Sequence, residues 1–137
     1  MTVDRHPLRY DPIAPLVAAT SPALNWAVRN DILDEEQDPR VLWTLPRVVH
    51  ARRWQNPDGS WTYHGGSQGF RSRQDYQQLA TYQELLLLVS LYRLDRRHPV
   101  IRLAAKSVLS NQKPEGDIRG IYGTQYTPNY TADTCHP

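Results

Sequence analysis

The stretch "QNPDGSW", residues 55–61, decides the fold predicted for this chain, because it recurs in altered form as "QKPEGDI" at residues 112–118. Glutamine, proline, an acidic residue and glycine keep their places over an offset of 57 residues, from 55 to 112. Each copy ends a segment of helical character that a proline introduces, Pro39 in the first case and Pro99 in the second. A repeat at such an interval is typical of folds that stack one supersecondary unit on the next.

The residue types of this motif suit a corner between two helices. Proline, then an acid, then glycine favour a tight turn. The glutamine amide can donate to carbonyl groups left unsatisfied at the end of a helix, and Trp61 offers a large flat surface with one N–H. A chance turn between two helices is the alternative. We interpret the motif as a structural staple made of Gln55, Asp58, Gly59, Trp61, Gln112, Glu115 and Gly116.

The first half of the chain predicts an arm and two helices. Residues 1–20 carry three prolines, which disfavour helix, so we expect an extended arm ahead of a repeat domain over 21–137. Ser21 and Pro22 open a helix to about residue 34. Its expected apolar face consists of Leu24, Val28 and Ile32, with Trp26 and Leu33 alongside. A second helix, from Asp38–Pro39 to about residue 54, should be interrupted at Pro46.

The second half predicts two more helices of different character. Between residues 74 and 94, Leu85 to Leu88 place apolar residues on every side, which is typical of a helix surrounded by others. From Pro99 onward, helical spacing places Arg102, Lys106 and Ser110 on one face and apolar residues on the opposite face. This pattern indicates a helix on the outside. No alternating strand pattern of any length appears, so the predicted class is all-α.

The Q-x-P-D-G-S-W pattern resembles the QW motif of the terpenoid cyclase and protein prenyltransferase superfamily, the squalene cyclase-like repeats. This resemblance covers about residues 38–135 and implies an α/α toroid, a ring of paired inner and outer helices. It also implies that Gln55, Trp61 and Gln112 stabilise the ring and do not touch substrate. The second copy departs from the pattern, because Ile118 replaces tryptophan.

Only two to three helical hairpins are legible, whereas a closed ring of this kind needs more than twice this length. The predicted fold is therefore an incomplete α/α toroid. An unclosed layer would leave apolar faces exposed. We accordingly expect either self-association or a missing remainder of the chain.

Three acidic or metal-binding motifs of this superfamily can be compared with the sequence. The D-x-D-D run of the protonating cyclases is absent. The acidic stretch 34–38 resembles a magnesium-diphosphate motif, but it abuts Pro39, where acids favour the next helix N-terminus. Asp133 and Cys135 resemble two zinc ligands of the prenyltransferases, but His136 is adjacent instead of distant, which favours coincidence. We therefore predict no metal site and no cofactor, and the catalytic residues stay unknown.

The loops after the two motif copies hold polar and aromatic side chains that could line a pocket mouth. Packing between repeats, with Asp117 paired to Arg119, is the alternative reading of the same residues. The candidate pocket residues are His64, Arg71, Asp75, Tyr76, Asp117, Arg119, Tyr122, Tyr126 and Tyr130.

Composition narrows the choice of partners. Sixteen Lys plus Arg against fourteen Asp plus Glu give a net charge of +2, too small to indicate nucleic-acid binding. The apolar runs are too short to span a membrane. A single cysteine, Cys135, and a start without a leader pattern make a cytoplasmic location the expectation.

Two functions are consistent with these observations. The first is a squalene cyclase- or prenyltransferase-like protein that binds an isoprenoid or another apolar small molecule, with its activity undecided. The second is a non-catalytic α/α repeat module for protein–protein interaction.

Overall fold

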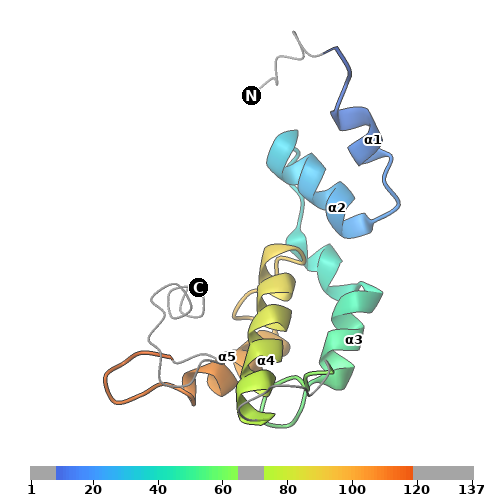
Figure 1. The fold of residues 1–137 in the computed structure, drawn as a ribbon. Coiled ribbons are helices and arrows are strands. Elements are labelled where there is room, and N and C mark those ends of the chain that lie inside the picture. Colours follow the sequence, from blue (N-terminus) through green and yellow to red (C-terminus); the bar gives the residue numbers. More distant parts are fainter. Residues whose placement is uncertain (1–8, 65–72, 119–137) are drawn as a thin grey trace.

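The computed structural model describes residues 9–64 and 73–118 of the chain (Figure 1). These residues are mainly helical and contain no strand, which confirms the predicted all-α class. None of their helices has the length and apolar character needed to cross a membrane. In chain order the elements are α1 (Ile13–Val17), α2 (Pro22–Ala27), the π-helix η1 (Val28–Ile32), the 3-10 helix η2 (Pro39–Thr44), α3 (Pro46–Trp54), α4 (Arg73–Ser90) and α5 (Pro99–Leu109).

The described part of the N-terminal arm differs from the extended conformation that was expected. Helix α1 occupies Ile13–Val17, and the Ile13 N–H donates to Asp11 Oδ1 at 2.9 Å. Pro15 is its third residue. Proline is tolerated there because the first N–H groups of a helix have no partner within the helix. Three prolines therefore did not exclude a short helix.

The cap of α2 was predicted correctly, and its apolar face in part. The Leu24 N–H donates to Ser21 Oγ at 3.4 Å. Of the predicted face, Trp26 and Val28 are buried, whereas Leu24 and Ile32 are exposed. The prediction assumed one regular α-helix to residue 34. Instead the chain enters the wider π-helical turns of η1, which rotate the later residues out of the expected register.

The interruption at Pro46 is confirmed. Leu45 has ψ 147°, an extended conformation that ends η2 before α3 begins at Pro46. Proline disfavours the α conformation in the residue before it, which explains the break. The N-terminus of η2 is capped by Asp38, whose Oδ1 accepts from the Arg40 N–H at 2.9 Å.

The helices in the described part of the chain do not surround α4, contrary to the prediction. Leu88 is fully buried, but Leu86 is 51% exposed. The described chain places packing partners on the Leu88 side of α4, so the Leu86 side faces outward. Helix α5 agrees better with its prediction, because Val100 and Ala104 are buried while Arg102 and Lys106 are exposed.

Two apolar clusters hold the helices together. The larger one joins α3, α4 and α5 and consists of Val48, Ala51, Trp61, Leu88, Leu94, Val100, Ile101 and Ala104. The smaller one joins α2 to η2 through Ala23, Trp26 and Leu42. Trp43 and Tyr92 pack against both clusters. They connect the N-terminal helices at one end of Figure 1 to the α3–α5 group at the other.

The helices before η2 and before α5 end in the same way. Asp34 and Arg93 adopt left-handed φ angles of 54° and 53°. Directly after them, the Glu35 N–H donates to the Arg29 carbonyl at 2.9 Å, and the Leu94 N–H donates to the Leu88 carbonyl at 3.1 Å. Both helices thus end in a left-handed residue followed by a bond to the carbonyl six positions earlier, one position wider than the bond of a Schellman C-cap.

The turns that lead into the following helices are also alike. Asp95 and Arg97 lie 57 residues after Asp38 and Arg40, the same offset as the motif. In each turn the arginine N–H donates to aspartate Oδ1, at 2.9 Å and 2.8 Å, and the arginine side chain closes an ion pair with the same carboxylate. These hydrogen bonds lower the pKa of Asp38 and of Asp95.

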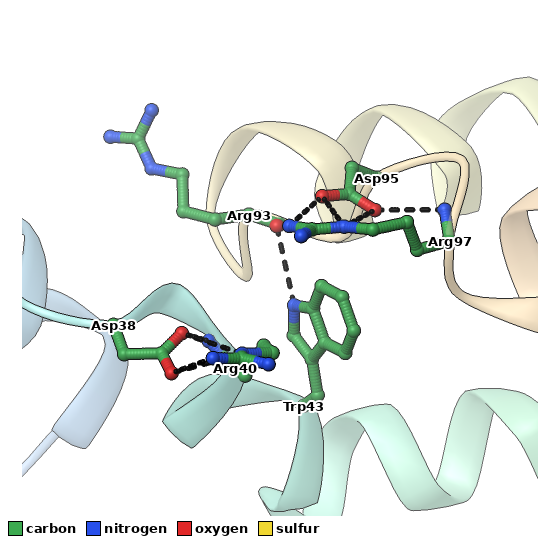
Figure 2. A network of polar contacts seen from close by, with 6 residues as sticks. All are labelled: Asp38, Arg40, Trp43, Arg93, Asp95 and Arg97. Carbon is green, nitrogen blue, oxygen red and sulfur yellow. Dashed lines mark hydrogen bonds and ion pairs between the residues drawn. The ribbon is translucent and has the colours of Figure 1, made fainter.

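Figure 2 shows the two turns on either side of Trp43. The indole Nε1–H donates to the Arg93 carbonyl at 3.3 Å, and the Arg97 guanidinium lies 5.7 Å from the centre of the indole ring. The structure therefore repeats a C-cap, an Asp–x–Arg turn, a helix and a motif turn, of which the sequence predicted the helix and the motif turn.

Candidate functional site

The first motif copy forms a closed turn at the end of α3. The Asn56 N–H donates to the Ser60 carbonyl at 2.8 Å, and the Gly59 N–H donates to the Asn56 carbonyl at 2.9 Å. Gly59 has φ 89°, a conformation that side chains disfavour. A Cβ atom on Gly59 would lie only 2.0 Å from the Leu103 carbonyl oxygen. Glycine is thus required here both for the turn and for the close approach of α5.

Gln55 ties this turn to α5. Its Nε2 donates to the Gly59 carbonyl at 3.0 Å and to the Val100 carbonyl at 2.9 Å. The second bond connects the end of α3 with the first turn of a helix that follows 45 residues later. One side chain therefore fixes the turn and seats the next helix.

Trp61 ties the same turn to the helices on its other side. Its ring is 6% exposed, and its Nε1–H donates to the Ala51 carbonyl in α3 at 2.9 Å. Its main-chain N–H donates to Thr81 Oγ1 in α4 at 3.0 Å. Trp61 is thus a structural residue of the core, joined to both α3 and α4.

Asp58 completes the turn as an ionised acceptor. Its Oδ1 accepts from the Ser60 hydroxyl at 2.6 Å and from the Ser60 N–H at 3.0 Å. The bond from the Ser60 hydroxyl, followed by that from the Ser60 N–H, lowers the pKa of Asp58. A carboxyl group held in this way is a turn residue and not a proton donor at neutral pH.

The second motif copy repeats the turn, and no helix among the described residues is seated on it. The Lys113 N–H donates to the Asp117 carbonyl and the Gly116 N–H to the Lys113 carbonyl, both at 2.8 Å, and Gly116 has φ 94°. Gln112 Nε2 donates to the Gly116 carbonyl at 2.7 Å. Among the described residues, the nearest atom to a Cβ on Gly116 would be Gln112 Nε2, at 3.9 Å.

A groove of about 810 Å³ lies between α3 and α4, above the first turn. On α3, Arg47, His50, Ala51 and Trp54 share one helix face by their spacing of three and four residues. Ala80, Gln83 and Glu84 form the wall on α4. The base is the segment from Trp61 to His64 that leaves the motif.

Charge within the groove is compensated. Arg47 and Glu84 form a bidentate ion pair with both N–O distances at 2.6 Å. The hydrogen bonds that Arg47 donates to Glu84 raise the pKa of Arg47, so its guanidinium stays charged. Trp54 stands at the rim, 58% exposed, with its ring centre 5.9 Å from that of His50. The groove thus presents aromatic walls and a neutralised pair of charges.

The structure places only part of the predicted pocket near this groove. His64 lines it, and Tyr76 packs on the lining residue Tyr63 with ring centres 4.9 Å apart. Asp117 belongs to the second motif turn. The backbone of Asp75 lies in α4, but its side chain is not described. The remaining candidates lie outside the described residues: Arg71, Arg119, Tyr122, Tyr126 and Tyr130.

Metal binding was not predicted, and the considered zinc residues Asp133, Cys135 and His136 lie outside the described residues. Residues 9–64 and 73–118 contain no group of three or more potential ligands. Within the acidic stretch 34–38, Asp38 is engaged with Arg40.

Sequence reasoning missed the main lining residues of the groove, Arg47, His50, Trp54 and Glu84. Their signal was available for α3, because residues 47, 50, 51 and 54 follow helical spacing. Glu84 lies opposite these residues because α4 packs against α3. No local sequence pattern predicts that tertiary contact.

No protein-family model matches the chain, and neither a curated protein nor a solved structure matches it. The resemblance to squalene cyclase-like repeats therefore rests on the motif itself.

Proposed function

We propose that the chain is part of a squalene cyclase-like α/α repeat protein that binds an apolar ligand, such as an isoprenoid, between α3 and α4. The observation that carries the proposal is the groove of about 810 Å³ with Trp54, Trp61 and Tyr63 in its lining. Ligand sites are typically concave, of about 300–1,000 Å³, and rich in aromatic side chains with few polar groups.

The chemistry of the walls favours an apolar ligand with a small polar end. The Arg47–Glu84 ion pair leaves no net charge to attract an anion. The exposed Trp54 ring offers apolar area that a prenyl chain would cover, with the gain expected from removing such area from water. His50 and His64 can exchange hydrogen bonds with a hydroxyl group at the other end.

The proposal concerns binding and not a reaction. Glu84 is the only carboxylate among the described lining residues, and both of its oxygens accept hydrogen bonds from Arg47. Protonating cyclases resembling this fold use clustered carboxylates, which the groove lining does not provide.

Isothermal titration with farnesol tests the proposal directly. We expect saturable binding to the wild-type chain and roughly tenfold weaker binding to Trp54→Ala, since truncating an aromatic anchor typically costs more than about 1 kcal/mol. Val49→Ala is the matched control, because Val49 is exposed on the same helix but does not line the groove. Absence of saturable binding, or equal affinity in Trp54→Ala, would contradict the proposal.

A second candidate function, a helical repeat module for protein–protein interaction, is favoured by a different observation. The second motif turn has the geometry of the first, and among the described residues no helix occupies it.

A further inference from the structure

A second pocket, of about 280 Å³, lies between the first motif turn, α4 and the end of α5. On α4 it is lined by Gln77, Gln78 and Thr81, whereas the groove uses other residues of the same helix. The pocket and the groove have no described lining residue in common. The pocket is therefore a separate site.

Buried polar side chains form part of the pocket wall. Ser60, Gln78 and Thr81 are 4%, 8% and 2% exposed, and among the residues whose burial is described they are the buried polar ones. All three line this pocket. Apolar side chains would fill a core position at a lower desolvation cost, so this concentration of polar groups favours a polar ligand.

The hydrogen-bond donors of the pocket wall are directed at other protein atoms. The Ser60 hydroxyl donates to Asp58 Oδ1 at 2.6 Å, and Gln77 Nε2 donates to Ser60 Oγ. The Thr81 hydroxyl donates to the Gln77 carbonyl at 2.6 Å. These donors are thus engaged within the protein.

The wall formed by α5 shows the same arrangement. The Ser110 hydroxyl and the Asn111 side-chain amide donate to the Ser107 carbonyl, at 2.7 Å and 3.0 Å. Within the described part of the chain, neither Asn111 Oδ1 nor Gln77 Oε1 accepts a hydrogen bond. The hydrogen-bonding capacity that remains is therefore mainly that of acceptors, which suits a ligand that donates.

The charge of the pocket is negative and uncompensated. Asp58 lies at its exposed rim, and the hydrogen bonds from Ser60 lower the pKa of Asp58, so its carboxylate is ionised at neutral pH. Asp58 forms no ion pair with a described residue, and no Lys, Arg or His is among the described lining residues. Mg²⁺ and Ca²⁺ sites usually contain more carboxylates than one. A donating organic cation fits this charge better.

We propose that this pocket binds a small primary amine as its ammonium ion. An ammonium group has one positive charge and three N–H donors. Asp58 Oδ2 is available to it, since the only donor printed for this oxygen, Gln77 Nε2, lies 3.4 Å away. Charge-assisted hydrogen bonds of this kind are the stronger ones. Val108 lines the same pocket and offers apolar surface to a short carbon chain.

A titration of the full chain with n-butylamine, followed by NMR, tests the proposal. We expect saturable shifts of the Ser60 and Thr81 amide signals. n-Butanol has the same carbon chain without the charge and should cause no saturable shift. N-acetyl-lysine amide has the same ammonium on a peptide backbone. Binding of both amines would assign the site to a lysine side chain, and binding of butylamine alone to a free amine.

Two variants with the same change of charge give the decisive comparison. Asp58→Asn keeps an oxygen acceptor for Ser60 but loses the charge, so the affinity for butylamine should fall at least about tenfold. Glu115→Gln is the matched control, because Glu115 holds the corresponding position of the second motif copy and does not line the pocket. It should bind butylamine like the wild type.

Asn111→Asp tests the proposal by a gain of affinity, which a folding defect would not produce. It adds a second carboxylate to the pocket and should tighten butylamine binding by about threefold. No saturable binding, equal shifts with calcium chloride, unchanged affinity in Asp58→Asn or an equal loss in Glu115→Gln would overturn the proposal. No isoprenoid is present in these titrations, so their result is independent of the proposed binding in the groove.

Discussion

The two motif turns have the same backbone and different surroundings. In the first, Gly59 lies beneath Leu103 and Gln55 reaches Val100, so the turn is part of the core that joins α3, α4 and α5. In the second, Gln112 reaches only its own turn among the described residues. The comparison shows that the turn forms from local hydrogen bonds, and that its contribution to tertiary stability depends on the helix seated upon it.

Substituting the glycines should separate the two turns most strongly. Alanine at either position is strained by the positive φ angle, at about 1–3 kcal/mol. Gly59→Ala must in addition displace the Leu103 carbonyl, so we expect a loss of more than about 4 kcal/mol of unfolding free energy. Gly116→Ala should show the strain alone. Urea denaturation of both variants measures the difference, and equal losses would contradict the comparison.

The aromatic position gives the next largest effect. Trp61→Phe removes the hydrogen bond to the Ala51 carbonyl and part of a buried ring, so the unfolding free energy should fall by about 2–3 kcal/mol. Ile118→Val, at the corresponding buried position, should cost about 0.5–1.5 kcal/mol. If thermal or urea unfolding ranked the two variants in the opposite order, the second turn would contribute more to the stability of the core than the first.

The glutamines should differ by a smaller amount. Gln55→Ala loses the bonds to Gly59 and to Val100, which together stabilise the fold by about 2 kcal/mol. Gln112→Ala should stay within about 0.5 kcal/mol of the wild type, as is usual for exposed positions. The measurement is made on dilute protein, where copies do not associate. A large loss in Gln112→Ala under those conditions would show that the second turn already stabilises the single chain.

The smallest expected effect is a pH dependence of folding stability that arises at the N-terminus of α5. His98 caps α5, with its Nδ1 accepting from the Val100 N–H at 3.3 Å. Burial, and then the nearby Arg52 charge, lower the pKa of His98, while Asp95 opposes them. The unfolded chain therefore binds more protons at mildly acidic pH, and stability should fall as the pH drops through about 6.5.

His98→Asn is the control for this titration, because asparagine caps a helix without titrating in this range. Denaturation midpoints at neutral and mildly acidic pH should differ less in this variant than in the wild type. An identical pH dependence in both would place the titrating group elsewhere.

The sequence was sufficient where the decisive interactions are local. Ser21 as a cap, the break at Pro46 and the motif turns follow from side chains that act on a neighbouring backbone. The burial of Val100, Ala104 and Val108 in α5 also followed from helical spacing, whereas Leu109 is exposed. In each case the responsible residues lie within a few positions of the feature they cause.

The failures have a tertiary cause. Leu24 is exposed because α2 packs through Ala23 and Trp26, and Leu86 is exposed because the described helices cover α4 on one side. The groove was missed because Glu84 meets Arg47 across two helices. The repeated Asp38–Arg40 turn could have been found, since its offset equals that of the motif.

The segment after each helix C-cap is where the length of the repeat can vary. From Asp34 to Asp38 the chain advances four positions, whereas from Arg93 to Asp95 it advances two, although the left-handed cap and the Asp–x–Arg turn are built alike in both units. From that aspartate to the glutamine, both units have equal length. The two extra residues, Glu36 and Gln37, are therefore where an engineer should graft a foreign peptide, since variation between the units already tolerates extra residues there.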